Sequence, residues 1–137
     1  MPHVNGILET AIYADDLQRS ATFYRELFGF ETLQKSERLI ALEVAGRNVL
    51  LIFKAGATHQ PFTTPGGTIP AHGGSGTTHF AFSIDAKDLA SWRQHLESAG
   101  VPVESVVEWP NGAESLYFRD PDQHLVELIT RGFWRIY

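Results

Sequence analysis

The chain of 137 residues contains no cysteine, which excludes disulfide bonds, thiolate nucleophiles and cysteine metal ligands. It has no apolar run long enough to span a bilayer, and its first ten residues lack the pattern of a signal peptide. Basic residues are few, 11 against 16 acidic ones, and the formal net charge of -5 is the opposite of a nucleic-acid binder's. We therefore expect a cytoplasmic protein without nucleic-acid or membrane partners.

The sequence contains the same order of predicted elements twice: a strand, a helix and three further strands. Residues 7–14 alternate as a strand does, and the helical spacing of 17–28 follows, between the N-cap candidates Asp15 and Asp16 and the C-cap candidate Gly29. Three apolar segments come next, at 30–36, 38–45 and 49–55. The same order returns as a strand at 79–84, a helix within 85–100 and strands within 102–109, 114–120 and 124–130. Repetition over this length indicates duplicated modules.

We place module one at about 5–56 and module two at about 78–133, within a single domain of 137 residues. Residues 57–77 between them are rich in Gly, Pro and Thr without periodicity, which predicts a long loop. We expect that loop to order over a pocket when ligand binds.

Three apolar strands each carry one residue with metal-binding atoms. Glu9 and His79 hold the same position in the first strand of the two modules, and Glu127 lies between Leu125 and Ile129 in the last strand. Each residue alone has an ordinary explanation, as a solvated glutamate or a structural histidine. An ionised carboxylate on a covered strand, however, costs several kcal/mol unless it is paired or metal-bound. Oxygen and nitrogen ligands without sulfur suit Zn, Ni, Mn, Fe(II) or Mg.

The segments at 6–31, 78–89 and 115–128 resemble the vicinal oxygen chelate superfamily of glyoxalases, bleomycin-resistance proteins and extradiol dioxygenases. The resemblance implies an α+β fold in which two tandem βαβββ modules form a curved, half-open mixed β-barrel with helices outside. It also implies one divalent metal ion, held by Glu9, His79 and Glu127.

The chain departs from several branches of that superfamily. The fourth ligand of the four-ligand members would fall at about Leu51, which is apolar. Extradiol dioxygenases and fosfomycin-modifying enzymes carry histidine where this chain has Glu9. Ser115 and Tyr117 match the latter enzymes, although such residues are widespread.

Five further residues are candidates for the site. Tyr117 and His72 are candidate catalytic groups, because a phenol can donate to a substrate oxygen and an imidazole exchanges a proton near neutral pH. Ser115, Arg119 and Trp109 are candidate substrate contacts. The solvated polar face of an edge strand would equally explain Tyr117, and an exposed loop would explain His72.

We interpret the chain as a metal-dependent enzyme that acts on a small molecule with two adjacent oxygens, and we expect it to form a homodimer. Lyase or isomerase chemistry of the glyoxalase type is favoured, and ring-cleaving dioxygenase chemistry is the second choice. The rival class is a metal-free drug-binding protein of the bleomycin-resistance type. The residues leave open the substrate, the metal, and whether one chain or two build the metal site.

Overall fold

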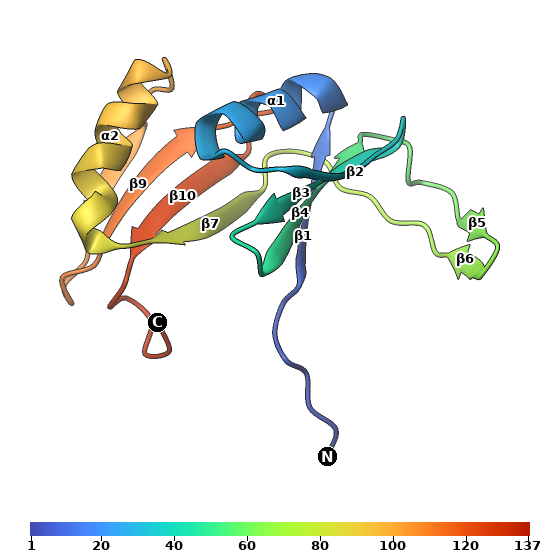
Figure 1. Cartoon of the computed structure of the whole chain (residues 1–137), viewed down its shortest axis with the longest axis horizontal. Helices are drawn as coiled ribbons and strands as arrows, with labels where there is room; N and C mark the ends of the chain where they lie inside the picture. The colour runs from blue at the N-terminus through green and yellow to red at the C-terminus, as the bar shows by residue number, and fades with distance from the viewer. The chain divides into compact units, whose positions relative to one another are not determined.

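The computed structural model describes all 137 residues and divides into two compact units, Met1–Gly76 and Thr77–Tyr137. Each unit contains one βαβββ module, so the predicted α+β class and the internal repeat are confirmed. Figure 1 shows the first unit from blue to yellow-green and the second from yellow to red. Neither main helix has both the length and the apolar character that crossing a membrane requires.

The first unit is a four-stranded mixed sheet in the order β1-β4-β3-β2. Its elements are β1 (Glu9–Ala14), α1 (Leu17–Phe28), β2 (Thr32–Lys35), β3 (Leu39–Val44) and β4 (Asn48–Lys54). The side chains of Ile12, Leu50 and Ile52 point to the face that α1 covers and are almost fully buried. Side chains alternate along β1, so Glu9 and Tyr13, four residues apart, share the face of the sheet that α1 does not cover.

Local capping sets the ends of α1 as the sequence predicts. Asp16 accepts a hydrogen bond from the backbone N–H of Arg19 at 3.0 Å, which satisfies one free donor of the first turn. Gly29 closes the helix with a left-handed φ of 73°, and its N–H donates to the carbonyl of Arg25 at 2.9 Å. The strand before the helix is shorter than expected, since it begins at Glu9 and leaves Ile7 and Leu8 exposed.

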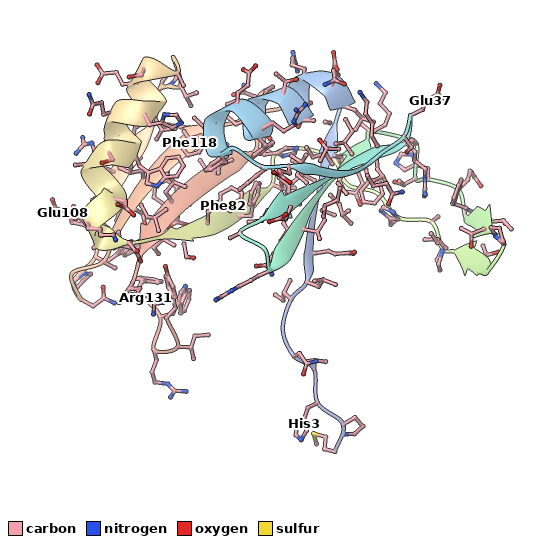
Figure 2. All side chains as sticks on the ribbon, in the orientation of Figure 1. His3, Glu37, Phe82, Glu108, Phe118 and Arg131 are labelled. Atoms are coloured by element: carbon pink, nitrogen blue, oxygen red, sulfur yellow. The ribbon has the colours of Figure 1, made fainter.

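The second unit repeats this sheet in the order β7-β10-β9-β8. Its elements are β7 (His79–Ile84), the 3-10 turn η1 (Ala86–Asp88), α2 (Leu89–Ser98), β8 (Ser105–Glu108), β9 (Glu114–Arg119) and β10 (Leu125–Thr130). Figure 1 shows α2 beside β9, and Figure 2 labels Phe118 of β9, a fully buried residue of this unit. The helix is shorter than the predicted segment because a 3-10 turn takes up its first residues.

The segment at 57–77 is not the patternless loop that its composition predicts. It contains a β-hairpin of β5 (Phe62–Thr64) and β6 (Gly67–Ile69), in which Phe62 pairs with Ile69. Pro65 and Gly66 form the connection between β-branched residues, which is a recognisable hairpin signal. The prediction of an irregular loop is therefore wrong at residues 62–69.

Candidate functional site

Two of the three candidate metal ligands meet on one face of the second sheet. His79 begins β7 and pairs in register with Leu125, while Glu127 lies two residues further along β10. The Nε2 atom of His79 is 3.2 Å from Oε2 of Glu127. The side chain of His79 is half exposed, whereas that of Glu127 is only 8% exposed. The carboxylate is therefore buried on this face, beside an imidazole that solvent can reach.

The imidazole of His79 is oriented by the backbone of the neighbouring strand. Its Nδ1 lies 3.0 Å from the carbonyl oxygen of Leu125, and a carbonyl can only accept, so Nδ1 carries the hydrogen. In the neutral ring, Nε2 then directs a lone pair toward the carboxylate of Glu127. Two facing lone pairs repel unless a proton or a cation lies with them.

The positions of Nε2 of His79 and Oε2 of Glu127 fit two ligand atoms of one divalent metal ion. Adjacent ligand atoms of a tetrahedral or octahedral ion are about 3.0–3.4 Å apart when each bond is about 2.1 Å long. The observed separation of 3.2 Å between Nε2 of His79 and Oε2 of Glu127 lies in that range. The hydrogen bond of Nδ1 to a carbonyl is also the usual support of a metal-bound imidazole.

The other oxygen of Glu127 is held by two hydroxyl groups. Ser115 donates to Oε1 at 2.6 Å and Tyr117 donates to the same atom at 3.0 Å. Both donors come from β9, whose register places Tyr117 directly opposite Glu127. Because Ser115 is fully buried, it holds the carboxylate from below and presents no surface to a substrate in this form.

Tyr117 lies in an interior strand, since β9 is flanked by β10 and β8. The explanation of this residue as part of a solvated edge strand is therefore wrong. Burial of the phenol, followed by its hydrogen bond to the Glu127 carboxylate and that group's charge, raises the pKa of Tyr117, and the neighbouring hydroxyl of Ser115 offsets part of this. The phenol thus stays protonated at neutral pH and acts as a donor rather than as a base.

Arg119 lies on the same face of the second sheet as Glu127, and Trp109, directly after β8, reaches that face at Ser115. The indole Nε1 of Trp109 donates to Oγ of Ser115 at 2.9 Å. Arg119 is occupied by a partner of its own, because its Nε lies 2.7 Å from Oε2 of Glu104. That ion pair leaves the Arg119 end of the face close to electrically neutral.

Glu9 belongs to the first unit and is exposed there. It pairs in register with Val49, as His79 pairs with Leu125 in the second unit. Two residues further along the last strand of each module lie Leu51 and Glu127, respectively. The register thus shows that Glu9 and His79 occupy equivalent positions of the repeat, and that Leu51 occupies the position equivalent to that of Glu127. Within either unit alone, no three His, Asp or Glu side chains form a cluster suited to one ion.

His72 also belongs to the first unit, where it is bound to a residue that sequence reasoning did not single out. Its Nδ1 is 2.7 Å from the hydroxyl of Tyr13, and its ring packs edge-on against Phe53 with centroids 4.7 Å apart. Tyr13 lies on the same face of β1 as Glu9. This shared face, which follows from the alternation of side chains along the strand, is the sequence signal that could have identified Tyr13.

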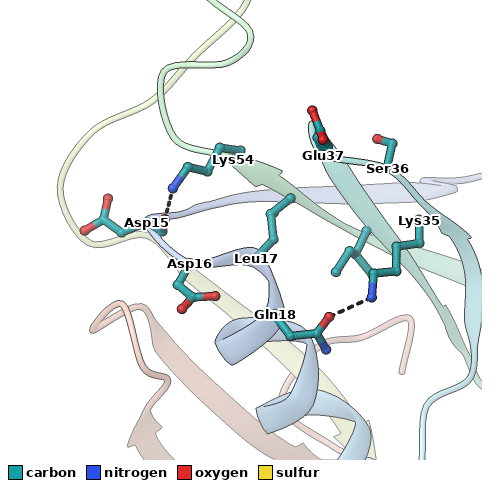
Figure 3. A pocket seen from close by; sticks show the side chains of 9 residues that line it. Asp15, Asp16, Leu17, Gln18, Lys35, Ser36, Glu37 and Lys54 are labelled. Atoms are coloured by element: carbon teal, nitrogen blue, oxygen red, sulfur yellow. Dashed lines mark hydrogen bonds between the residues drawn. The ribbon is translucent and has the colours of Figure 1, made fainter.

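A hollow of about 630 Å³ opens beside the N-terminus of α1 (Figure 3). Lys35 donates there to the side chain of Gln18 at 2.8 Å, and Lys54 donates to the carbonyl of Asp15. Because Lys54 and Ile40 alternate with residues of the Glu9 face, the hollow lies on the opposite, helix-covered side of the sheet. It contains none of the candidate site residues.

Known proteins of similar sequence and structure were compared with the chain. The family model of the Glyoxalase/Bleomycin resistance protein/Dioxygenase superfamily matches residues 6–128. Metallothiol transferase FosB from Bacillus licheniformis is 30% identical over 132 residues, which are 91% of this chain and 75% of that protein. Catechol-2,3-dioxygenase from Bacillus subtilis is 29% identical over 126 residues, 87% of this chain but only 40% of the dioxygenase.

Among solved structures, the lactoylglutathione lyase from Agrobacterium tumefaciens superposes with a TM-score of 0.88 at 36% identity. The match covers 96% of this chain and 98% of that one, so the two folds correspond over nearly their whole length. With the family model matched from residue 6 to residue 128, the chain belongs to the Glyoxalase/Bleomycin resistance protein/Dioxygenase superfamily.

Proposed function

We propose that the protein is a divalent-metal-dependent enzyme that acts on a small molecule with two adjacent oxygen atoms. The observation that carries the proposal is the approach of Nε2 of His79 to Oε2 of Glu127, 3.2 Å apart, in a ring whose Nδ1 is held by the carbonyl of Leu125. A buried carboxylate with one oxygen directed at an imidazole nitrogen is suited to bind a cation.

Glu9 is the proposed third ligand, because it occupies in module one the position that His79 occupies in module two. We accordingly propose that the two modules function together as one domain. Two carboxylates and one imidazole would offset the charge of a divalent ion and leave open positions for substrate oxygens. The set suits Zn, Ni, Mn, Fe(II) or Mg.

A bound divalent ion supplies Lewis-acid stabilisation of negative charge on a substrate oxygen. The side chains of the protein would position the metal ligands and exchange a proton with the substrate. Ser115 and Tyr117 hold Glu127 in place, at 2.6 and 3.0 Å from Oε1. His72, hydrogen-bonded to Tyr13 at 2.7 Å, is the proposed group that accepts or returns a proton.

Lyase or isomerase chemistry of the glyoxalase type is our first choice of reaction. Its support is the similarity to lactoylglutathione lyase, at 36% identity over nearly the whole chain. A second candidate is transfer of a thiol to a small molecule, supported by the similarity to metallothiol transferase FosB at 30% identity. Both relatives are named for thiol compounds, so thiol adducts are the substrates to assay first. Ring-cleaving dioxygenase chemistry ranks below them, because the chain spans only 40% of the dioxygenase.

The metal site is tested by the Glu127→Gln variant, which keeps the shape of the side chain but removes its charge. We expect its divalent-metal affinity to fall sharply, as should that of Glu9→Gln and His79→Ala. Glu43→Gln is the control, since Glu43 is also a glutamate in a strand, although less buried than Glu127, and its Oε1 accepts from the N–H of Gly46. Metal content and affinity are measured on protein purified without added metal.

The thermal stability of the same preparations gives an independent measurement. Metal at 100 times its dissociation constant stabilises a folded protein by about 2.7 kcal/mol, and the ligand variants should lose that gain. Unchanged metal occupancy in Glu127→Gln would overturn the assignment and favour a metal-free binding protein of the bleomycin-resistance type.

A further inference from the structure

We infer that Trp109 is a positioning residue for the candidate metal ligand Glu127, acting through the hydroxyl of Ser115. The relay consists of three side chains joined by two hydrogen bonds, Trp109 to Ser115 and Ser115 to Glu127. It determines which oxygen of Glu127 is left for a cation. The inference rests on the proposed metal function and deepens it.

The direction of the relay follows from the chemistry of the indole. A tryptophan Nε1–H can only donate, so at 2.9 Å the Oγ atom of Ser115 must accept from Trp109. The hydroxyl hydrogen of Ser115 is then directed elsewhere. The carboxylate oxygen Oε1 of Glu127, 2.6 Å away, is the acceptor that it meets.

The consequence for Glu127 is an unequal pair of oxygens. Oε1 accepts from both Ser115 and Tyr117, which uses its two lone-pair directions. Oε2 is the oxygen that faces His79. Because Ser115 is fully buried and Glu127 is almost so, neither side chain can exchange these partners for water without opening the sheet face.

The indole itself is held by the C-terminal segment of the chain. Phe133 packs against Trp109 with ring centroids 4.4 Å apart, and Asn111 donates to the carbonyl of Phe133 at 3.2 Å. The segment closes on itself, because the N–H of Gly132 donates to the carbonyl of Tyr137 at 3.0 Å. The aromatic end of the chain is therefore connected to the candidate ligand through Trp109.

The test uses the full-length protein and two variants. Trp109→Phe keeps an aromatic ring against Phe133 but removes the N–H, and Ser115→Ala removes the hydroxyl. The matched control is Trp92→Phe, which removes an indole N–H from α2 of the same unit. Three quantities are measured: Mn²⁺ affinity, the visible absorption spectrum of the Co²⁺-loaded protein, and the melting temperature without metal.

We expect Ser115→Ala to weaken Mn²⁺ binding by about 10- to 100-fold and Trp109→Phe by up to about tenfold, as for other residues that orient metal ligands. Both should also change the Co²⁺ spectrum, because Glu127 gains freedom to present either oxygen. Trp92→Phe should match the wild type in affinity and spectrum. A purely structural role for Trp109 would lower the melting temperature alone and leave the Co²⁺ spectrum unchanged.

His79→Ala in the same titration separates this inference from the proposed function. If the wild type binds no divalent ion, or binds it as well without His79, the metal function itself fails. If His79→Ala abolishes binding while Trp109→Phe has the affinity and the Co²⁺ spectrum of the wild type, the metal function stands and the relay is overturned.

Discussion

Two buried serines of this protein show how differently the same hydroxyl can act. Ser115 is enclosed between Trp109 and Glu127 and bonded to both, at 2.9 and 2.6 Å. Ser20 is equally buried in α1, but its Oγ has no hydrogen-bond partner.

We predict opposite results when each is replaced by alanine. Ser115→Ala leaves an indole N–H and a carboxylate without their partner, and should destabilise the metal-free protein by about 1–3 kcal/mol. Ser20→Ala removes an unsatisfied buried oxygen and adds a better helix former, so its free energy of unfolding should be unchanged or higher. Urea denaturation of both variants measures the contrast, and equal destabilisation would contradict it.

At the scale of elements, α1 depends on the charge of its N-cap. The backbone N–H of Arg19 is the main reason that the pKa of Asp16 lies below its ordinary value. A lowered folded-state pKa means that the stabilisation is present above the unfolded pKa and is lost as pH falls through the folded one.

Asp16→Ala should therefore lower the melting temperature at neutral pH, and the difference from the wild type should shrink in acid as that carboxyl is protonated. Asp15→Ala is the control, because the cap bond comes from Asp16. A difference between wild type and Asp16→Ala that stays constant from pH 7 down to strong acid would contradict this account. Melting curves across that pH range provide the measurement.

The segment after the first sheet is attached to that unit by hydrogen bonds rather than free along its length. The N–H of His72 donates to the carbonyl of Thr58 at 2.9 Å, Thr58 Oγ1 donates back to the carbonyl of His72 at 2.6 Å, and Tyr13 holds the ring. Because Thr58 is fully buried, these bonds resist opening.

We predict that the amide of His72 exchanges hydrogen slowly in the ligand-free protein and faster in Tyr13→Phe. Tyr137→Phe is the control, since that hydroxyl contacts Ile84 of the second unit. Fast exchange at His72 in the wild type would instead support the expectation from the sequence, in which the segment becomes ordered when ligand binds.

For the whole molecule, we predict a homodimer. Each sheet has unpaired outer strands, and apolar side chains are exposed on them, with Leu33 of β2 56% exposed and Val106 of β8 40% exposed. Exposed strand edges are normally covered or paired. Light scattering at micromolar concentration should give twice the chain mass of 15.3 kDa, and a monomer would contradict the prediction.

Much of this architecture was available from the sequence, because it depends on local rules. Alternating apolar residues predicted the main strands, and Asp16 and Gly29 marked the ends of α1 within a residue. The hairpin at 62–69 was missed because the Gly- and Pro-rich composition around it was taken to mean irregular structure.

The sequence by itself determined the candidate metal ligands: the repeat placed Glu9 and His79 at equivalent positions, and the apolar strand around Glu127 made its charge stand out. Only the tertiary structure decided what those residues contact. The bonds of Glu127 to Ser115 and Tyr117, and of Ser115 to Trp109, depend on the strand register, which local pattern does not specify. A shift of β9 by one residue would turn both hydroxyl groups to the opposite face of the sheet.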